Sequence, residues 1–286
     1  MSMNKYGKVA TIVSTYNRVA YLRECLRSLL AQDPAPDTII IVDGSETAGT
    51  EEIIRKEFAQ VEYVRVRENI GGAGQIYIGM KIAYKEGYDW FWIMDDDVRI
   101  IRKDGLKILL SKVQKLRSAG VPVGAVIPLQ LIKGGVVKIE PLSIFVGGLI
   151  SREVIDKVGF PRYDFFLYYD DVEYAYRITI AGFTIKYAPP ILEHRGWPQR
   201  PSFHIRFLKR TSSLPILSKK RMFYLTRNGI IFSKEYKLMT LLIRIIAGSL
   251  IRGIAYTFLL QDPLMVFYVI RGLIEGFFGF TKTRIL

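Results

Sequence analysis

The sequence contains one cysteine, two histidines and no long uncharged apolar run. Cys25 cannot form a disulfide within the chain, which suits a reducing compartment, and it falls on the apolar face of a predicted core helix. Half of the 286 residues are hydrophobic, enough for a sizeable core without cross-links. The apolar segment 238–280 is interrupted by residues such as Arg244 and Arg252, so no uncharged run approaches the roughly 20 residues that span a bilayer. Residues 7–14 are too short for a signal peptide and are typical of a strand.

Acidic residues are also in the minority. The chain has 41 Lys and Arg against 27 Asp and Glu, a formal net charge of +14. Such an excess indicates an anionic partner, which on charge alone is a nucleic acid, a membrane surface or a phosphorylated small molecule.

Strands and helices alternate through the first part of the chain. Apolar runs at 8–14, 38–42 and 61–66 are each followed by a polar turn and a helical pattern, and a fourth run covers 90–94. This alternation predicts an α/β fold with a doubly wound, mostly parallel sheet. The carboxyl ends of parallel strands meet at one edge, so the polar turns after these strands should share one crevice.

Three consecutive carboxylates, Asp95, Asp96 and Asp97, follow the fourth strand directly. Adjacent acids repel one another, and a cation or open water in front of them relieves the repulsion. Oxygen ligands favour a hard divalent ion such as Mg²⁺ or Mn²⁺. The alternative is a solvated acidic turn.

The other turns at this edge suit a nucleoside diphosphate. They are Thr15-Tyr16-Asn17-Arg18, Asp43-Gly44-Ser45 and the glycine-rich stretch 69–74. Glycines at the start of a helix let backbone N–H groups approach phosphate oxygens closely. The spacings of dinucleotide folds and P-loops are not met.

A second acidic stretch holds the candidate base. Asp170 and Glu173 have the spacing of a capping box, so Asp170 is either a helix cap or part of the site. Asp171 on the first turn would then face the crevice, and neighbouring aromatic residues would raise its basicity, as suits a general base. His194 reaches the acid triplet only if the chain folds back, and a lone histidine is more often structural than a ligand.

The C-terminal region has a different character. Basic residues scattered along the apolar segment 238–280 suit a pair of helices lying at an anionic membrane surface. Core helices or a contact between subunits of a homo-oligomer are the alternatives. We expect one domain over residues 1–230 and a helical extension over 231–286.

The motifs occur in the order seen in family 2 glycosyltransferases, which have the GT-A fold, and the resemblance covers roughly residues 5–230. The stretch Asn69-Ile70-Gly71-Gly72-Ala73-Gly74, followed by a helix, Asp89 to Met94 and the triple aspartate, resembles the galactofuranosyltransferase and rhamnosyltransferase branch. Gln75 departs from the Gly-Phe usual after the glycines, which leaves the shape of the donor pocket open.

The resemblance implies a role for each matching residue. Asp95 and Asp97 would bind Mn²⁺ or Mg²⁺ together with His194, and Asp171 would be the catalytic base. Nucleotide-sugar binding is implied for Thr15, Tyr16, Asn17, Arg18, Asp43, Asn69, Gly72, Asp95, Asp96 and Arg227. Asp170 and Trp197 would contact the acceptor or the donor sugar.

The implied activity is inverting transfer of a sugar, galactofuranose or rhamnose, from a UDP or dTDP donor to a glycan or lipid-linked acceptor. Such an enzyme of envelope polysaccharide synthesis is expected in the cytoplasm, peripheral on the inner face of the cell membrane. One alternative is a sugar-phosphate nucleotidyltransferase. The other is a basic nucleic-acid-binding protein; acid clusters at the crevice and the lack of a helix-turn-helix, zinc or stacking motif argue against nucleic acid as a partner.

Overall fold

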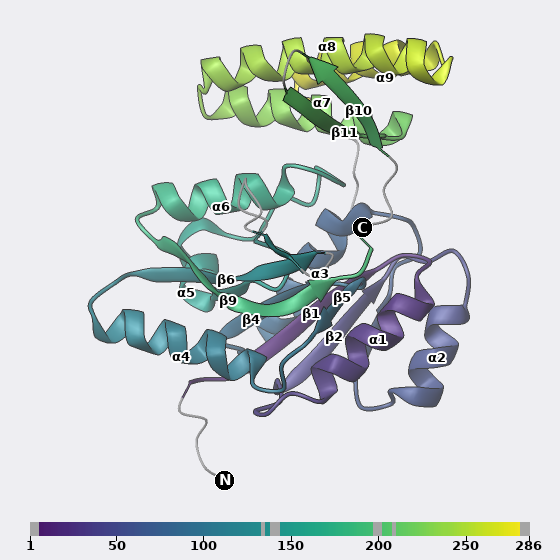
Figure 1. Cartoon of the computed structure of the whole chain (residues 1–286). Coiled ribbons are helices and arrows are strands. Elements are labelled where there is room, and N and C mark those ends of the chain that lie inside the picture. Colours follow the sequence, from purple (N-terminus) through teal and green to yellow (C-terminus); the bar gives the residue numbers. More distant parts are fainter. Residues whose placement is uncertain (1–5, 133–134, 138–143, 197–201, 208–209, 281–286) are drawn as a thin grey trace. The chain divides into compact units, whose positions relative to one another are not determined.

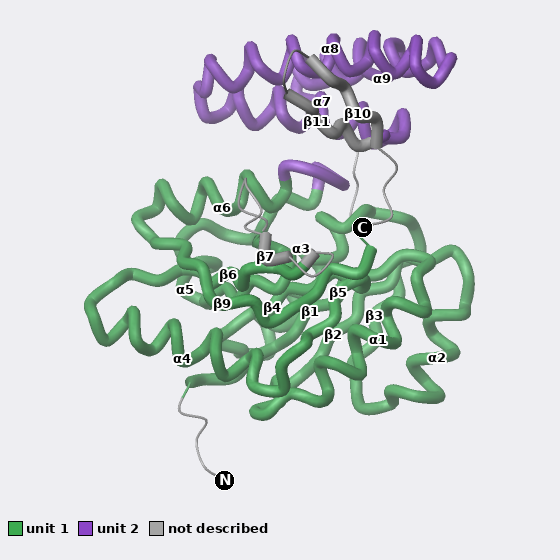
Figure 2. Tube along the Cα trace, in the orientation of Figure 1, with its two compact units in different colours: residues 1–163, 170–198, 285–286 green, residues 164–169, 199–284 purple. Residues whose placement is uncertain are grey.

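Figure 1 shows a computed structural model of the chain, in which residues 6–132, 135–137, 144–196, 202–207 and 210–280 are described. The chain divides into two compact units, coloured in Figure 2. Unit 1 comprises Met1–Tyr163, Asp170–Pro198 and Ile285–Leu286, and unit 2 comprises Asp164–Tyr169 and Gln199–Arg284. The domain boundary predicted at residue 230 falls inside helix α7 (Lys219–Glu235) of unit 2.

Unit 1 is built on one sheet with the strand order β3-β2-β1-β4-β8-β6-β9-β5, and β7 pairs with β6. The strands are β1 (Val9–Thr15), β2 (Thr38–Asp43), β3 (Glu62–Arg65), β4 (Trp90–Asp95), β5 (Val98–Ile100), β6 (Val123–Ile132), β7 (Gly135–Val137), β8 (Leu149–Ser151) and β9 (Thr184–His194). Strands β3, β2, β1 and β4 are parallel, as predicted, and β6 is parallel to β9. Strand β8 runs antiparallel between β4 and β6.

Helices cover both faces of this sheet (Figure 1). They are α1 (Val19–Leu30), α2 (Gly49–Glu57), α3 (Gly71–Lys85), α4 (Gly105–Ser118), α5 (Arg152–Val158) and α6 (Asp170–Ile180). Because successive side chains of a strand point to opposite faces, Trp90 and Trp92 pack with α1, α2 and α4, while Phe91 and Ile93 pack with α3, α5 and α6. Cys25 is buried in the first of these two cores, where its helical position predicts it.

Unit 2 consists of a hairpin of β10 (Ser202–Phe207) and β11 (Arg210–Pro215) and the helices α7, α8 (Met239–Leu260) and α9 (Leu264–Phe278). Helix α7 packs against both α8 and α9. Glycines allow the close approach of α9: a Cβ atom at Gly272 would lie 2.9 Å from the Phe223 carbonyl oxygen. Helix α8 is long and apolar enough to cross a membrane by length and composition, and 22% of its most apolar window is buried.

Candidate metal and nucleotide site

The acid triplet sits where β4 ends, and a short return strand brings a histidine to it. Asp95 is the last residue of β4, and β5 begins directly after Asp97. Strand β5 pairs antiparallel with the end of β9, which sets Val98 opposite His194. The chain therefore folds back and brings His194 beside the acid triplet.

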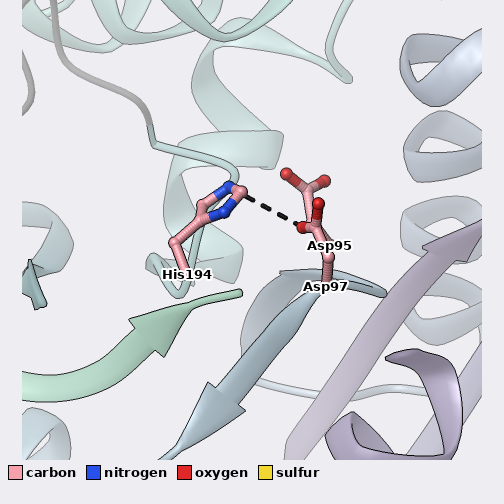
Figure 3. A group of neighbouring side chains, drawn as sticks. All are labelled: Asp95, Asp97 and His194. Atoms are coloured by element: carbon pink, nitrogen blue, oxygen red, sulfur yellow. Dashed lines mark ion pairs between the residues drawn. The ribbon is translucent and has the colours of Figure 1, made fainter. Parts of the chain in front are cut away.

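Asp95, Asp97 and His194 form a cluster of potential metal ligands (Figure 3). One ligand atom from each residue lies within 4.8 Å of the others, and His194 Nε2 is 3.7 Å from Asp97 Oδ1. Asp97 Oδ1 is buried and accepts no hydrogen bond from the described residues. Two carboxylates and an imidazole form a donor set that fits Mn²⁺, and an unsatisfied buried carboxylate oxygen is what a metal ligand requires.

The neighbourhood of Asp97 is shaped closely around its carboxylate. The Arg195 N–H donates to the Asp97 carbonyl oxygen at 2.8 Å. A Cβ atom at Gly196 would lie 2.0 Å from Asp97 Oδ2, so a side chain at that position would displace the carboxylate. His194 thus supplies the imidazole, and the two residues after it surround Asp97.

Asp96 turns away from this cluster and joins β1 to β4. It accepts hydrogen bonds from Thr15 Oγ1 at 2.8 Å and from the Tyr16 N–H at 3.4 Å. The half-exposed Arg18 guanidinium donates through Nη1 to Asp97 Oδ2 at 2.6 Å and to Asp96 Oδ1 at 3.3 Å. Five of the residues predicted for the site are therefore linked by direct contacts.

The charges in this cluster change one another's proton affinity. Burial raises the pKa of Asp95 well above its usual range, and the nearby carboxylates of Asp97, Asp96 and Asp170 add to the rise. Burial also raises the pKa of Asp96, to about 6, although Arg18 opposes the change. A divalent cation would neutralise this excess of negative charge, as Arg18 does in part.

The turn after β2 is tied to the turn after β1. Asp43 is fully buried and accepts hydrogen bonds from the Ser45 N–H at 2.8 Å and from the Tyr63 hydroxyl at 2.7 Å. Asn17 has a left-handed backbone, φ 55°, and its N–H donates to Ser45 Oγ at 2.8 Å. The Tyr16 hydroxyl donates to Glu46 Oε1 at 2.6 Å. Asp43 thus fixes the turn after β2, and Ser45 connects that turn to the turn after β1. The predicted nucleotide contact of Asp43 stays a prediction.

The glycine-rich stretch forms the beginning of α3. Asn69 Oδ1 accepts the Gly71 N–H at 3.0 Å, and a Cβ atom at Gly72 would meet nothing within 4 Å. Helix α3 begins at Gly71, within the glycine-rich stretch itself. Gly71 is buried and Gly72 is half-buried, and the free space beside Gly72 leaves room for phosphate oxygens at the helix start.

Gln75, where the sequence departs from its relatives' pattern, is a structural residue. It is 2% exposed, and its Nε2 donates to the Thr15 carbonyl oxygen at 2.8 Å. The same nitrogen lies 2.5 Å from where a Cβ atom of Gly44 would be. Gln75 therefore links the turns after β1 and β2 to α3, a role that its position in a helical pattern did not reveal.

The second acidic stretch opens α6. Asp170 is the first residue of the helix and is 9% exposed, whereas Asp171 is half-buried. Burial raises the pKa of Asp170 to about 8, with Asp171 as the largest charge contributing to the rise. Glu173 forms an ion pair with Arg177, Oε1 to Nε 2.7 Å. The charge of Asp170 also contributes to the raised pKa of Asp95, and its predicted contact with the acceptor or donor sugar stays a prediction.

Two predicted residues remain, Arg227 and Trp197. Arg227 is on α7 in unit 2, is 3% exposed, and donates through Nη2 to the Asp164 carbonyl oxygen at 3.0 Å. Its predicted contact with a diphosphate stays a prediction. Trp197 lies outside the described residues.

Comparisons with known proteins agree with this geometry. Residues 11–128 match the family model for glycosyl transferase family 2, a stretch that contains β1 to β4 and the acid triplet. Solved structures of glycosyltransferases share the fold. A mannosyltransferase from Pyrobaculum calidifontis, in complex with GDP-Man and Mn²⁺, has a TM-score of 0.55 at 16% identity over 96% of this chain and 88% of its own. TarS 1-349 of S. aureus has a TM-score of 0.56 at 14% identity over 94% and 80%. Residues 11–128 therefore match family 2 glycosyltransferases, and the chain has the GT-A fold.

Within that family the sequence is galactofuranosyltransferase-like. It is 29% identical to galactofuranosyltransferase GlfT1 of Mycolicibacterium smegmatis over 199 residues, which are 61% of this chain and 66% of the relative. It is 28% identical to GlfT1 of Mycobacterium tuberculosis over 198 residues, 61% of this chain and 65% of the relative. The match thus leaves about a third of each relative's length uncovered.

Proposed function

We propose that this protein is a metal-dependent, inverting glycosyltransferase, which moves a sugar from a nucleoside-diphosphate sugar to an acceptor hydroxyl. The observation that carries the proposal is the cluster at the end of β4. There Asp95, Asp97 and His194 lie within 4.8 Å of one another by their ligand atoms, and Asp97 Oδ1 lacks a hydrogen-bond partner among the described residues. The Mn²⁺ and GDP-Man bound to the Pyrobaculum calidifontis neighbour, and the UDP bound to TarS, support it.

Asp95, Asp97 and His194 would hold Mn²⁺ or Mg²⁺. When bound, such an ion is a Lewis acid that stabilises the charge growing on the departing diphosphate. Arg18, already at the rim of the cluster, adds a second positive charge for the phosphates. Asp96, fixed by Thr15 and the Tyr16 N–H, is assigned to the ribose and the sugar. The open start of α3 at Asn69 and Gly72 accommodates the diphosphate.

Asp171 is the proposed general base. It takes the proton of the acceptor hydroxyl, whose oxygen attacks the anomeric carbon as the bond from that carbon to the diphosphate oxygen breaks. Attack in line with the leaving group inverts the anomeric configuration. Asp170, with a pKa of about 8, keeps its proton at neutral pH, so the carboxylate role falls to Asp171. Asp170 and Trp197 remain assigned to contacts with the acceptor or donor sugar.

The galactofuranosyltransferase relatives support a galactofuranose donor. We propose a UDP-sugar or dTDP-sugar donor carrying galactofuranose or rhamnose, and an acceptor hydroxyl on a glycan or a lipid-linked glycan. Arg227 is kept as a proposed diphosphate contact.

The C-terminal helices favour work at a membrane surface. Large apolar side chains are exposed along α8 and α9, among them Ile251 (67%), Phe258 (78%) and Phe278 (71%). Arg244 and Arg271 are exposed on the same two helices, and cations beside an exposed apolar face suit an anionic interface. We propose a peripheral protein on the cytoplasmic face of the membrane, where a lipid-linked acceptor is within reach.

A donor screen tests the activity. The protein with Mn²⁺ is incubated with UDP-galactofuranose, UDP-galactopyranose, dTDP-rhamnose and GDP-mannose, and the release of nucleoside diphosphate is measured. We expect one UDP or dTDP donor to be hydrolysed, with release lost in EDTA. Release of pyrophosphate from a nucleoside triphosphate and a sugar phosphate would instead identify a nucleotidyltransferase. Retention of random oligonucleotides on a filter, with every donor untouched, would identify a nucleic-acid-binding protein.

A further inference from the structure

The segment that precedes the acidic pair has an unusual backbone. Phe166, Tyr168 and Tyr169 all have left-handed conformations, with φ between 65° and 67°. L-residues with side chains avoid this region because the Cβ atom crowds the backbone, and bulky aromatic residues do so especially. Three such residues among four persist only where the surroundings hold them. The residue after Tyr169 is Asp170, the first of the pair.

A single buried amide on α7 binds the backbone of this segment. Asn228 is fully buried, and its Nδ2 donates to the carbonyl oxygens of Phe165 (2.8 Å), Leu167 (2.8 Å) and Tyr168 (2.9 Å). Three carbonyl oxygens around one atom require that atom to be the NH₂ group, which fixes the orientation of the amide. Asn228 therefore closes the segment into a loop around its side chain.

Arg227 orients that amide. Its Nε donates to Asn228 Oδ1 at 2.8 Å, and its Nη2 donates to the carbonyl oxygens of Asp164 (3.0 Å) and Phe165 (3.3 Å). The guanidinium thus binds the outer side of the amide and the start of the loop at once. Its planar fork allows this, and a lysine ammonium could not match it.

One face of α7 continues these contacts along the whole loop. Arg221 Nη1 donates to the Tyr168 hydroxyl at 3.2 Å, and Tyr224 stacks on Phe166 with ring centroids 4.7 Å apart. Phe232 packs against Tyr169 at 5.8 Å. Residues 221, 224, 228 and 232 are spaced by three or four positions, so they share one side of the helix.

We propose that Asn228, oriented by Arg227, is a positioning residue for sugar transfer: it holds loop 164–169, the segment directly before Asp170 and Asp171 in the chain, in the left-handed shape from which α6 begins. The inference rests on the proposed function of the acidic pair. It also explains why the six residues 164–169 belong to unit 2 although unit 1 surrounds them in the sequence.

The test compares Asn228→Asp with a matched control, Thr226→Val. The aspartate keeps the shape and the acceptor for Arg227 but turns an oxygen toward the three carbonyl oxygens. Thr226 is equally buried on α7, and its hydroxyl instead bonds Ser249 Oγ of α8 at 3.0 Å. We expect kcat of Asn228→Asp to fall about 10-fold or more, since small misplacements of a catalytic group are costly. Affinity for UDP or dTDP with Mn²⁺, measured by calorimetry, should stay within about twofold in both variants.

Hydrogen exchange of the backbone amides in peptide 164–172 gives a readout that does not depend on activity. It should accelerate in Asn228→Asp and stay unchanged in Thr226→Val. If the wild type transfers no sugar, the proposed function fails, while the exchange still decides whether Asn228 holds the loop. Equal exchange and equal kcat in Asn228→Asp and Thr226→Val would overturn the inference.

Arg227→Lys carries the same test if Asn228→Asp does not fold, and it separates the two roles proposed for Arg227. A fall in kcat with unchanged nucleotide affinity and faster exchange in 164–172 supports positioning. A loss of nucleotide affinity with unchanged kcat and unchanged exchange would make Arg227 a diphosphate contact and would contradict the positioning role.

Discussion

At the scale of single residues, the acidic pair at the start of α6 places its two carboxyl groups in different surroundings. Asp170 is 9% exposed with a pKa raised by burial to about 8, while Asp171 is half-buried on the first turn. Burial favours the protonated form of Asp170, so the less buried Asp171 is the better candidate for the ionised carboxylate. This division favours Asp171 as the group that accepts the acceptor's proton.

Asp171→Asn should therefore lower turnover by on the order of 10²-fold or more, because the amide keeps the shape but cannot accept a proton. Donor affinity should change little, since the base contacts the acceptor. Initial rates and donor KM measured side by side for Asp171→Asn and Asp170→Asn check this. An inactive Asp170→Asn beside an active Asp171→Asn would exchange the roles of the two acids.

The raised pKa of Asp170 also predicts how stability depends on pH. An aspartate in the unfolded chain has a pKa near 3.9, whereas Asp170 in the fold has a pKa of about 8. Between these values the native state binds the extra proton, so the contribution of Asp170 to stability falls as pH rises from about 4 to 8. Asp170→Asn should lose less stability over this interval than the wild type. Denaturant midpoints at pH 5 and pH 8 measure the difference. The same change in midpoint between these two pH values in the wild type and in Asp170→Asn would contradict the assignment.

At the scale of elements, the pattern of apolar runs predicted the framework of the site, whereas the metal role of His194 was implied only by the family resemblance. Strands β1, β2 and β4 are long apolar runs that end in polar turns, so their parallel arrangement and the position of Asp95 and Asp97 followed from the pattern. Strand β5 has three residues, too few for a periodic signal, yet its pairing with β9 is what brings His194 to the acids. Likewise, Asn228 contacts loop 164–169 across some 60 residues of sequence, and no local pattern carries that information.

The sequence pattern also gives an incomplete picture of the helix starts. Asp104 occupies the N-cap position of α4, but its side chain forms no cap hydrogen bond and instead pairs with Arg102 at 3.0 Å. Helix α3 begins within the glycines because Asn69 Oδ1 binds the Gly71 N–H, a local bond that the glycine content conceals. The sequence pattern indicates roughly where a helix begins. Which polar group a side chain at the helix start binds depends on contacts that the pattern does not contain.

Helices α8 and α9 yield a prediction about membranes. Their exposed apolar side chains, with Arg244 and Arg271 beside them, should bind vesicles containing anionic lipid, and high salt or alkaline carbonate should release the protein. The double variant Ile251→Asn, Phe258→Asn should sediment far less with such vesicles. Ile180→Asn on α6 in unit 1, which alters an apolar side chain of similar exposure (60%), is the matched control.

Other outcomes of the sedimentation assay have distinct meanings. Helix α8 has 22 residues, about 33 Å at 1.5 Å per residue, so retention after carbonate would show that it spans the bilayer. A stable dimer that ignores vesicles would identify the exposed face as a contact between subunits.

At the scale of the whole molecule, the chain contains a GT-A domain and a helical unit with exposed apolar side chains. The net charge of +14 suits both anionic partners proposed, the nucleotide diphosphate and the lipid surface. The acid cluster at the end of β4 carries negative charge although the chain as a whole is basic. A divalent cation at the cluster would allow a diphosphate to approach it.

The most direct measurement of this claim is calorimetry of UDP and dTDP with the wild type and with Asp97→Ala, in Mn²⁺ and in EDTA. We expect at least one of the two nucleotides to bind the wild type about tenfold or more tightly with Mn²⁺, and Asp97→Ala to remove the difference. Asp104→Ala, which alters an exposed acid outside the cluster, should bind as the wild type does. Equal nucleotide affinity with and without Mn²⁺, unchanged in Asp97→Ala, would contradict the metal-dependent site.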